Sequence, residues 1–306
     1  MKKDLHYFYS YWTGLNEKMF RSAVREFIDN GADKFVITCP LIGEMLKNRE
    51  RVDFLHKICK EMQVEFSAIH APYGKEYDLN IPESRECREK MFDTHIRALR
   101  IAAEFGCRTY PIHMGAYHYC FDKVPLEKLR PLARETMDKI LPEAEKLGII
   151  IAVENSFEKP NSAKETLKLI DQYAGNPFVG VCYDTGHANL MEYRPGKEKS
   201  NFSEGFRNCW WEGIEWENDA IGMLKDHIVT CHIHDNNGYS DLHAMPKDGT
   251  IDWQKLMPEL FSCPRIIEYQ TEVCFDDGTN WAGKLKAPVG GYSIRRMTDT
   301  FRSLGF

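Results

Sequence analysis

The chain has 306 residues, 43% hydrophobic and 28% charged, a composition typical of a globular protein with a sizeable core. Its net charge of −6 gives no overall basic field for nucleic acid, and no run approaches the roughly 20 apolar residues of a membrane helix. The ten cysteines form no CxxC pair, and the stretch MKKDLHYFYSYW lacks the apolar region of a secretory signal. We therefore expect a cytoplasmic protein with reduced cysteines and no membrane partner.

Eight short runs rich in β-branched and aromatic residues recur along the chain, at 5–9, 34–38, 64–70, 108–113, 148–155, 178–184, 228–234 and 265–273. Amphipathic stretches with helical spacing lie between them, near 15–31, 42–62, 82–106, 125–148, 162–173, 219–225, 252–260 and 293–304. This alternation predicts a parallel sheet, and eight units favour closure into a (β/α)₈ TIM barrel. No GxGxxG or GxxxxGK[ST] loop occurs, which weakens the open-sheet nucleotide-binding alternatives.

One segment stands apart from the alternating pattern. Residues 194–218, RPGKEKSNFSEGFRNCWWEGIEWEN, follow the sixth predicted strand, are long for a βα connection and are rich in tryptophan. A long loop in a compact domain is usually a lid or a binding loop. The segment either covers a ligand or forms a contact in a homodimer or homotetramer, and the sequence leaves both open. No linker divides the chain, so we expect residues 1–306 to form a single domain.

The carboxyl ends of the predicted strands carry histidines and acids, and a barrel places its chemistry at those ends. In chain order they are His70, His113, Glu154, Asp184 with His187, His232 with His234 and Asp235, the loop residues Asp241 and His243, and Glu268 with Glu272. Any one of these is ordinarily a hydrogen-bonded structural residue. Together they converge on one rim, where uncompensated burial of each carboxylate would cost on the order of several kcal/mol. A divalent cation resolves that cost, so the pattern predicts a metal site.

The ordered motifs HAPY, IHMG, VENS, DTGHA, HIHD…DLH…DGTIDW and QTEV resemble those of the xylose-isomerase-like TIM barrels. That superfamily includes the sugar phosphate isomerases and epimerases and the endonuclease IV-type AP endonucleases. The resemblance covers nearly the whole chain, most clearly from the third predicted strand onward. On the sugar branch it implies one divalent metal (Mn²⁺, Zn²⁺, Co²⁺ or Mg²⁺) held by Glu154, Asp184, His232 and Glu272. Glu272 is preferred over Glu268 because it lies nearer the end of its strand, nineteen residues after Trp253.

The sugar branch implies an isomerase or epimerase of carbohydrate metabolism that acts on a small sugar, keto-sugar or polyol. Two adjacent substrate oxygens would bind the metal, which would stabilise the enediolate formed when a carbon-bound proton leaves. Glu154 and Glu272 would flank the sugar, one removing the proton and the other returning it on the opposite face. The expected substrate contacts are His70, His113, His187, Glu158 and, stacking on the sugar, Trp211.

Other activities stay open. An endonuclease IV-like hydrolase would use three zinc ions and add His70, His113, His187, Asp241 and His243 as ligands, and all five positions carry matching residues. The candidate loops GKEYDLN and HDNNGYSDLHAM carry little positive charge, which disfavours a nucleic-acid partner. Against the epimerases, Gly238 stands about where they often place an arginine, and Lys247 stands where a glycine is common. An inosose-type dehydratase shares the enediolate step, whereas a binding protein with a decayed site is not supported, because no ligand position is visibly replaced.

Overall fold

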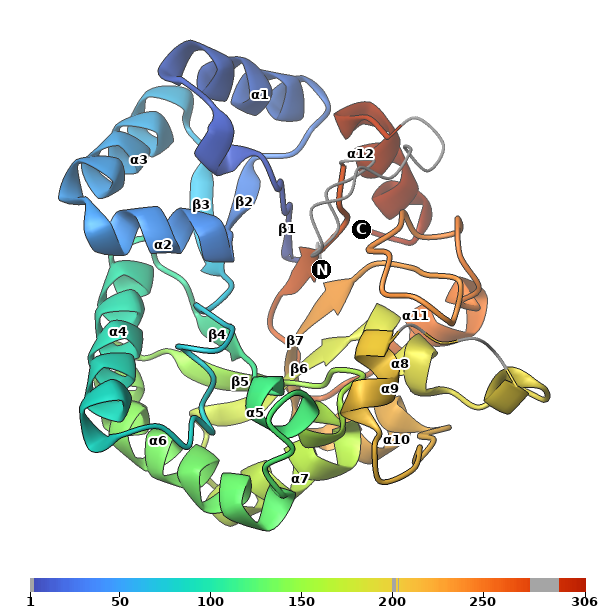
Figure 1. Cartoon of the computed structure of the whole chain (residues 1–306). Coiled ribbons are helices and arrows are strands. Elements are labelled where there is room, and N and C mark those ends of the chain that lie inside the picture. Colours follow the sequence, from blue (N-terminus) through green and yellow to red (C-terminus); the bar gives the residue numbers. More distant parts are fainter. Residues whose placement is uncertain (1–2, 200–201, 203, 276–291) are drawn as a thin grey trace.

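Eight parallel strands surround a common axis in the computed structural model, which describes residues 3–199, 202, 204–275 and 292–306 (Figure 1). The strands are β1 (Leu5–His6), β2 (Lys34–Ile37), β3 (Glu65–Ile69), β4 (Thr109–Ile112), β5 (Ile150–Glu154), β6 (Val179–Asp184), β7 (Ile228–Ile233) and β8 (Tyr269–Thr271). Six of them form one sheet in the order β1, β8, β7, β6, β5, β4, and β2 pairs with β3. All these pairings are parallel, as the alternating pattern predicts.

Backbone contacts join the two sheets into one closed wall. Tyr7 makes a parallel bridge to Phe35, which links the chain after β1 to β2. On the other side the amide of Ala71 donates to the carbonyl of Pro111 at 3.0 Å, which links the end of β3 to β4. The predicted (β/α)₈ barrel is therefore confirmed.

Twelve α-helices are described, most of them outside the barrel wall (Figure 1). They are α1 (Glu17–Asp29), α2 (Cys39–Lys47), α3 (Arg49–Met62), α4 (Arg85–Glu104), α5 (Tyr117–Cys120), α6 (Leu126–Leu147), α7 (Ala163–Ile170), α8 (Thr185–Met191), α9 (Glu204–Cys209), α10 (Ala220–Leu224), α11 (Trp253–Phe261) and α12 (Ile294–Ser303). The prediction of a single helix near 42–62 is wrong, because α2 and α3 are separate there. Asn48 divides them: its backbone is extended, and its side chain accepts a hydrogen bond from the amide of Glu50 and so caps α3.

The other long helices follow their sequence patterns. In α1 the Asn16 side chain caps the first turn, and Phe20, Val24 and Phe27 recur at helical spacing on the buried face. The longest helix, α6, ends at Gly148, which adopts the left-handed conformation with φ of 71°. The apolar faces of these helices and the strands share one hydrophobic core.

The barrel interior is polar along β8, where Glu268, Gln270 and Glu272 are buried. Alternate residues of a strand point to the same side, so Glu268, Gln270 and Glu272 form one column. Glu268 lies inside the barrel, because its Oε1 accepts a hydrogen bond of 2.6 Å from the hydroxyl of Thr109 on β4, which is not a neighbour of β8 in the sheet. The column leads from this contact to Glu272 at the carboxyl end. The interpretation of Glu268 as a structural acid agrees with this position.

The Trp-rich segment folds onto the loops that follow β4 and β5. Of the predicted insert at 194–218, residues 200, 201 and 203 lie outside the described residues. Its helix α9 and the buried Trp210 join a small apolar cluster of their own, separate from the main core, with partners that include Tyr119, Cys120 and Phe157. The indole of Trp210 donates to the carbonyl of Phe157 at 2.8 Å.

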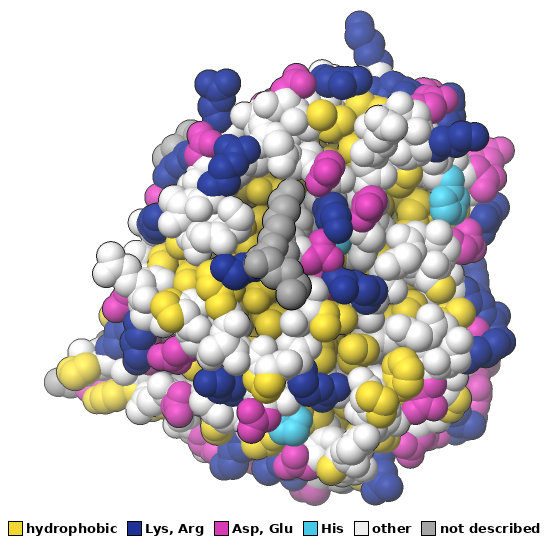
Figure 2. Space-filling view, turned by 180° about the vertical axis from the view of Figure 1, so that it is seen from behind, with side chains coloured by type: hydrophobic (Ala, Val, Ile, Leu, Met, Phe, Trp, Pro, Cys, Tyr) yellow, Lys and Arg dark blue, Asp and Glu magenta, His cyan; other side chains and the backbone are white. Residues whose placement is uncertain are grey.

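The surface carries charges of both signs. Figure 2, which views the molecule from behind Figure 1, shows basic and acidic side chains interspersed rather than gathered by sign. In the parts of the chain that the structure describes, no helix combines the length and apolar character needed to cross a membrane.

Candidate metal centre

Four residues from four consecutive strands meet at the carboxyl end of the barrel. Parallel pairing aligns Asp184 at the end of β6 with His232 on β7, and Glu154 at the end of β5 with Cys182 on β6. Glu272 follows β8 directly. Each of Glu154, Asp184, His232 and Glu272 offers one ligand atom, and these four atoms lie within 4.8 Å of one another.

The atoms at this centre face one another without neutral hydrogen-bond donors between them. His232 Nδ1 lies 3.1 Å from Glu154 Oε1, 3.3 Å from Glu272 Oε2 and 4.0 Å from Asp184 Oδ2. Glu154 is 1% exposed, and neither of its carboxylate oxygens has a hydrogen-bond partner. His232 Nδ1 and Glu272 Oε2 are likewise buried and unpaired. Buried groups of this kind are costly unless a cation or a charge partner compensates them, so the residues fit a divalent metal.

A second group of possible ligands lies beside the first. His187, His234, Asp241 and His243 also bring ligand atoms within 4.8 Å of one another. Asp241 Oδ2 lies 3.4 Å from His187 Nε2 and 3.3 Å from His243 Nε2. The other oxygen of Asp241 is buried and unpaired. This group can hold a further cation.

A third group shares Glu154. His70 Nε2 and His113 Nε2 lie 3.5 and 3.4 Å from Glu154 Oε2. The other oxygen of this carboxylate, Oε1, is the one that lies 3.1 Å from His232. These two histidines directly follow β3 and β4, so each strand from β3 to β8 supplies a side chain at this rim from its end or from the residue after it. The structure thus brings together all the histidines and acids that the sequence assigns to the metal, including those that only the three-zinc reading uses.

Local backbone features hold these ligands in place. Asp184 caps α8 and accepts the amide of His187 at 2.6 Å, which explains why an acid and a histidine stand three residues apart after β6. Gly186 lies against the ring of His234, where an added Cβ would come 2.1 Å from Cε1. The ring of His234 in turn reaches both oxygens of Asp184, at 2.9 and 3.0 Å. The DTGHA motif therefore needs its glycine for the close approach of β7.

Several histidines have one ring nitrogen held by a backbone carbonyl. His70 Nδ1 lies 2.7 Å from the carbonyl of Ala71, and His243 Nδ1 lies 2.9 Å from the carbonyl of Glu272. Such a bond leaves Nε2 free to bind a metal and fixes the orientation of the ring. Asp235 anchors the loop between β7 and α11 by accepting the indole of Trp253 at 2.7 Å.

The two acids at the centre are held in their ionised form. Burial raises the pKa of Glu154, but the facing charges of His232 and His113 outweigh it and hold that pKa well below its usual range. Burial also raises the pKa of Glu272, and His232 and His243 lower it well below the ordinary value. Both carboxylates are therefore available as anionic ligands or bases.

The histidines shift the other way. Burial lowers the pKa of His187, whereas the charges of Asp184 and Asp241 raise it, with a net result of about 10. Burial lowers the pKa of His232, but the neighbouring Cys182, Glu154 and Glu272 raise it well above its ordinary value. A bound cation would take the place of these protons, because a metal ligand must be deprotonated.

Two aromatic residues that sequence reasoning did not assign to the site form its walls. Tyr73 lies with its ring centre 5.2 Å from that of His70 and 5.5 Å from that of His113. Phe157 lies 5.8 Å from His187. His234 was noted in the sequence, but its place in the second group depends on its approach to Asp184. Tyr73 is the last residue of the HAPY motif, and Phe157 directly follows the VENS motif. Their places in these motifs are the sequence signals from which both aromatic residues could have been predicted.

Two predicted substrate contacts, Trp211 and Glu158, make their described contacts with other residues. The ring of Trp211 is 41% exposed and lies 5.5 Å from Tyr119, beside Lys123. Glu158 accepts a hydrogen bond from Asn161 at 3.2 Å and is half-buried. The described contacts of these two side chains do not include a residue of the metal centre, and their roles stay predictions.

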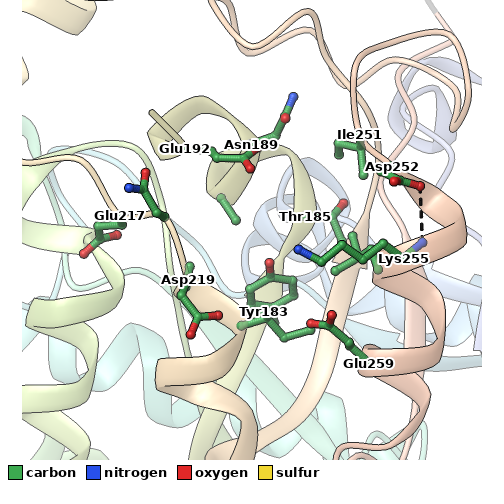
Figure 3. Close-up of a pocket in the computed structure, with 15 residues that line it drawn as sticks. Tyr183, Thr185, Asn189, Glu192, Glu217, Asp219, Ile251, Asp252, Lys255 and Glu259 are labelled. Atoms are coloured by element: carbon green, nitrogen blue, oxygen red, sulfur yellow. Dashed lines mark hydrogen bonds between the residues drawn. The ribbon is translucent and has the colours of Figure 1, made fainter. Parts of the chain in front are cut away.

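A separate cavity lies outside the barrel wall (Figure 3). Tyr183 precedes Asp184 on β6, and its side chain points the other way, toward α8, α10 and α11. Lys255 and Glu259 of α11 complete that side of the cavity. None of the possible metal ligands lines it, so it is no part of the centre.

Comparison with known proteins places this rim in a family. Residues 32–287 match the model of the xylose isomerase-like TIM barrels. The chain belongs to that family. The family resemblance noted in the sequence is thereby confirmed, and the ligand groups lie at the end of the barrel where the fold carries its chemistry.

The curated relatives leave the activity open. An uncharacterised protein of Sinorhizobium fredii, y4fM, is 27% identical over 253 residues, which are 76% of this chain and 72% of that protein. A probable endonuclease 4 of Natranaerobius thermophilus is 26% identical over 189 residues, 60% of each protein.

Solved structures share their fold with nearly the whole of this chain. The D-psicose 3-epimerase of Clostridium cellulolyticum H10, solved with D-tagatose, is 14% identical with a TM-score of 0.70, covering 98% of each chain. The IOLI protein, solved with a zinc atom, is 15% identical with a TM-score of 0.66, covering 98% of this chain and 96% of its own. At these identities the likeness establishes the fold alone.

Proposed function

We propose that the protein is a metal-dependent isomerase or epimerase of a small sugar, keto-sugar or related polyol. The observation that carries this proposal is the pair of buried acids, Glu154 and Glu272, which lie 3.1 and 3.3 Å from the same ring nitrogen, His232 Nδ1. Epimerisation beside a carbonyl needs a base on one face of the substrate and an acid on the other. Two buried acids at one cation site would provide that arrangement if a sugar bound between them.

The centre would hold its cation through Glu154, Asp184, His232 and Glu272. Bound there, a divalent ion supplies Lewis acidity that stabilises negative charge on a substrate oxygen. Imidazole and carboxylate ligands suit Zn²⁺ and Mn²⁺ and related ions, so the metal is proposed by class rather than by element.

The protein's own groups would move the proton. Glu272 would take the proton from the carbon beside the carbonyl, and Glu154, having first taken up a proton from solvent, would deliver it to the opposite face. Glu272 would then return its proton to solvent, and the two acids would exchange roles in the other direction. His70 and His113 lie against Glu154 Oε2, where they orient that oxygen and can hydrogen-bond a substrate hydroxyl. Burial of the centre keeps bulk water away from the carbanion-like intermediate.

The walls of the site support a small substrate. Phe157 contacts His187 on one side and stacks with Phe206 of α9 on the other, at 6.0 Å. The Trp-rich segment is thereby built into one side of the mouth. A duplex would require a broad, basic approach surface, whereas the segment 72–84 contains only Lys75 as a basic residue.

The test is proton exchange with solvent. Protein loaded with Mn²⁺ or Zn²⁺ is incubated in D₂O with a panel of ketoses and aldoses, and deuterium at C2 and C3 is followed by NMR. We expect exchange with at least one member, lost in Glu154→Gln and in Glu272→Gln, and retained in Glu268→Gln as the matched control. Full exchange in either of the first two variants would remove the two-acid mechanism.

A second candidate is a hydrolase of phosphate esters, favoured by one observation. The groups around Asp241 and around His70 and His113 can hold ions in addition to the central one. Several adjacent cations suit displacement at phosphorus, because they bind both the attacking and the leaving oxygen.

Metal content and one variant separate the two candidates. About three zinc ions per chain, together with cleavage of bis(p-nitrophenyl) phosphate that His243→Gln abolishes, would favour the hydrolase. About one ion per chain, with sugar proton exchange that survives in His243→Gln, would favour the isomerase.

A further inference from the structure

Two buried cysteines meet where the Trp-rich segment touches the barrel. Cys120 ends α5, after β4, and Cys209 ends α9, 89 residues later. Their sulfur atoms lie 2.7 Å apart. Ordinary non-bonded contacts between heavy atoms are about 3.5–4.0 Å, and a disulfide bond is about 2.05 Å. The distance between the two sulfurs is therefore shorter than a non-bonded contact, and a further approach of less than about 1 Å would bring them to bonding distance.

This sulfur pair is unusual within the chain. All ten cysteines are described and none is in a disulfide. Among the hydrogen-bond contacts described between its residues, the one between Cys120 and Cys209 is the only one that joins two sulfur atoms. Neither belongs to a group of histidines, cysteines and acids able to hold a metal ion. The pair is therefore suited to redox chemistry rather than to zinc.

We propose that Cys120 and Cys209 are a modification site at which a reversible disulfide fastens the Trp-rich segment to the loop after β4. The inference does not rest on the proposed function. The reaction with a disulfide oxidant such as oxidised glutathione runs in two steps. One thiolate attacks the oxidant, forms a mixed disulfide and releases one glutathione thiolate. The other thiolate then attacks the protein sulfur and releases the second glutathione, so two protein thiols lose two electrons and the oxidant gains them.

The surroundings determine when this reaction can occur. Cys120 is 1% exposed and Cys209 is 5% exposed. Contact with Cys209 and burial raise the pKa of Cys120, so the closed form holds the thiol protonated. Oxidation thus proceeds through local opening of α9, and the closed form then brings the second sulfur into place.

The pair is tied to the candidate centre by a short chain of contacts. Phe206, three residues before Cys209, stacks on Phe157 at 6.0 Å. Phe157 lies 5.8 Å from His187. A disulfide would therefore hold α9 against the wall of the mouth, while its loss would free that wall to open.

The experiment is native oxidation of the full chain followed by peptide mapping. The protein is incubated with excess oxidised glutathione until Cys87, which is exposed, is fully modified. Free thiols are then blocked, and the chain is digested with trypsin without reductant. Residues 109–123 and 208–225 form tryptic peptides that contain one cysteine each, Cys120 and Cys209. We expect these two peptides to be joined, and separated again by dithiothreitol.

Variants and stability make the outcome decisive. Cys209→Ala and Cys120→Ser should each prevent the cross-link, whereas Cys107→Ser, another buried cysteine, should leave it intact. The cross-link closes a long loop, so the oxidised protein should melt about 5 °C higher than the reduced protein. Unlinked peptides after Cys87 is fully modified, or a link to any other cysteine, would overturn the proposal.

Discussion

The two ends of β8 each bury a glutamate, and the contrast between them shows what separates a structural acid from a reactive one. At the amino end, Glu268 Oε1 accepts hydrogen bonds from Thr109 at 2.6 Å and Gln270 at 3.2 Å. Arg108 Nε lies 3.8 Å from its other oxygen. At the carboxyl end, Glu272 faces His232 and His243 with an oxygen that no hydrogen bond satisfies.

The difference lies in the partners rather than in the burial. Glu268 is 0% exposed and Glu272 is 8% exposed, so depth alone would identify the wrong residue. Neutral donors satisfy one oxygen of Glu268, and its other oxygen, which also has no hydrogen-bond partner, lies 3.8 Å from the fixed cation Arg108. Imidazoles converge on Glu272 and leave it able to bind an ion or move a proton. Predictions that disturb one end and spare the other therefore test the assignment.

The largest effect is expected at the carboxyl end. Glu272→Gln keeps the size of the side chain but removes both its charge and its basicity. We expect the rate of the proposed reaction to fall about 10³-fold or more, with circular dichroism unchanged. Glu268→Gln, measured in the same assay, should alter the rate less than about tenfold. Equal losses in the two variants would remove the contrast between the ends.

Metal removal is the next test of the same contrast. If the orphaned oxygens of Glu154 and Glu272 are metal ligands, chelation followed by dialysis should abolish activity and lower the melting temperature. Re-addition of Zn²⁺ or Mn²⁺ at about 100 times its dissociation constant should restore roughly 2.7 kcal/mol of stability. Glu154→Gln should lose most of this metal-dependent gain, and Glu268→Gln should keep it. A gain of the same size in both would place the ion elsewhere.

Most of the barrel could be predicted from the sequence, because strand and helix patterns are local. The eight strands were found from apolar runs, and the boundaries of α4 and α6 follow from their amphipathic periods and terminal caps. The division of 42–62 into α2 and α3 was missed. It depends on the extended backbone of the single residue Asn48, which periodicity does not reveal.

The ligands could be predicted by position but not their grouping. Parallel strands bring their ends to one rim, so His70 through Glu272 were expected to lie near one another. That Asp184 serves both His232 and His234, and that Glu154 serves two groups, depends on side-chain directions across the barrel. The packing of the Trp-rich segment on Phe157 depends on long-range contacts that no local pattern encodes.

Two buried histidines, His95 and His187, differ in their partners as the two glutamates do, and pH tests this difference. His95 on α4 is buried without an acid, and burial lowers its pKa to about 4, although its contact with the carbonyl of Tyr77 raises it. His187, buried among acids, has a pKa raised to about 10. The pKa of His95 is about 6.5 in the unfolded chain. Between pH 6.5 and pH 4 the imidazole is therefore mostly protonated in the unfolded state and mostly neutral in the folded state.

Stability should therefore fall as the pH decreases from 6.5, by about 2 kcal/mol from His95 alone at pH 5.0 and by about 3 kcal/mol below pH 4. Urea unfolding at pH 7.5 and pH 5.0 measures the decrease. The metal-site histidines titrate as well, so the informative quantity is the difference between the wild-type protein and His95→Gln. The variant should be less stable at pH 7.5 but should lose less on acidification. An identical decrease in both proteins would show that His95 does not carry this dependence.

The smallest effect is expected from Thr109→Val, at the structural end. The change keeps the shape of the side chain and removes the hydroxyl that donates to Glu268 at 2.6 Å. The acid keeps Gln270 and the charge of Arg108, so we expect a loss of about 1–3 kcal/mol in unfolding free energy rather than collapse. Metal affinity and the rate of the proposed reaction should stay within about twofold, because Glu272 lies at the far end of the column. If metal affinity fell together with stability, the two ends of β8 would be coupled. The different partners of Glu268 and Glu272 would then not be enough to assign a structural role to one and a reactive role to the other.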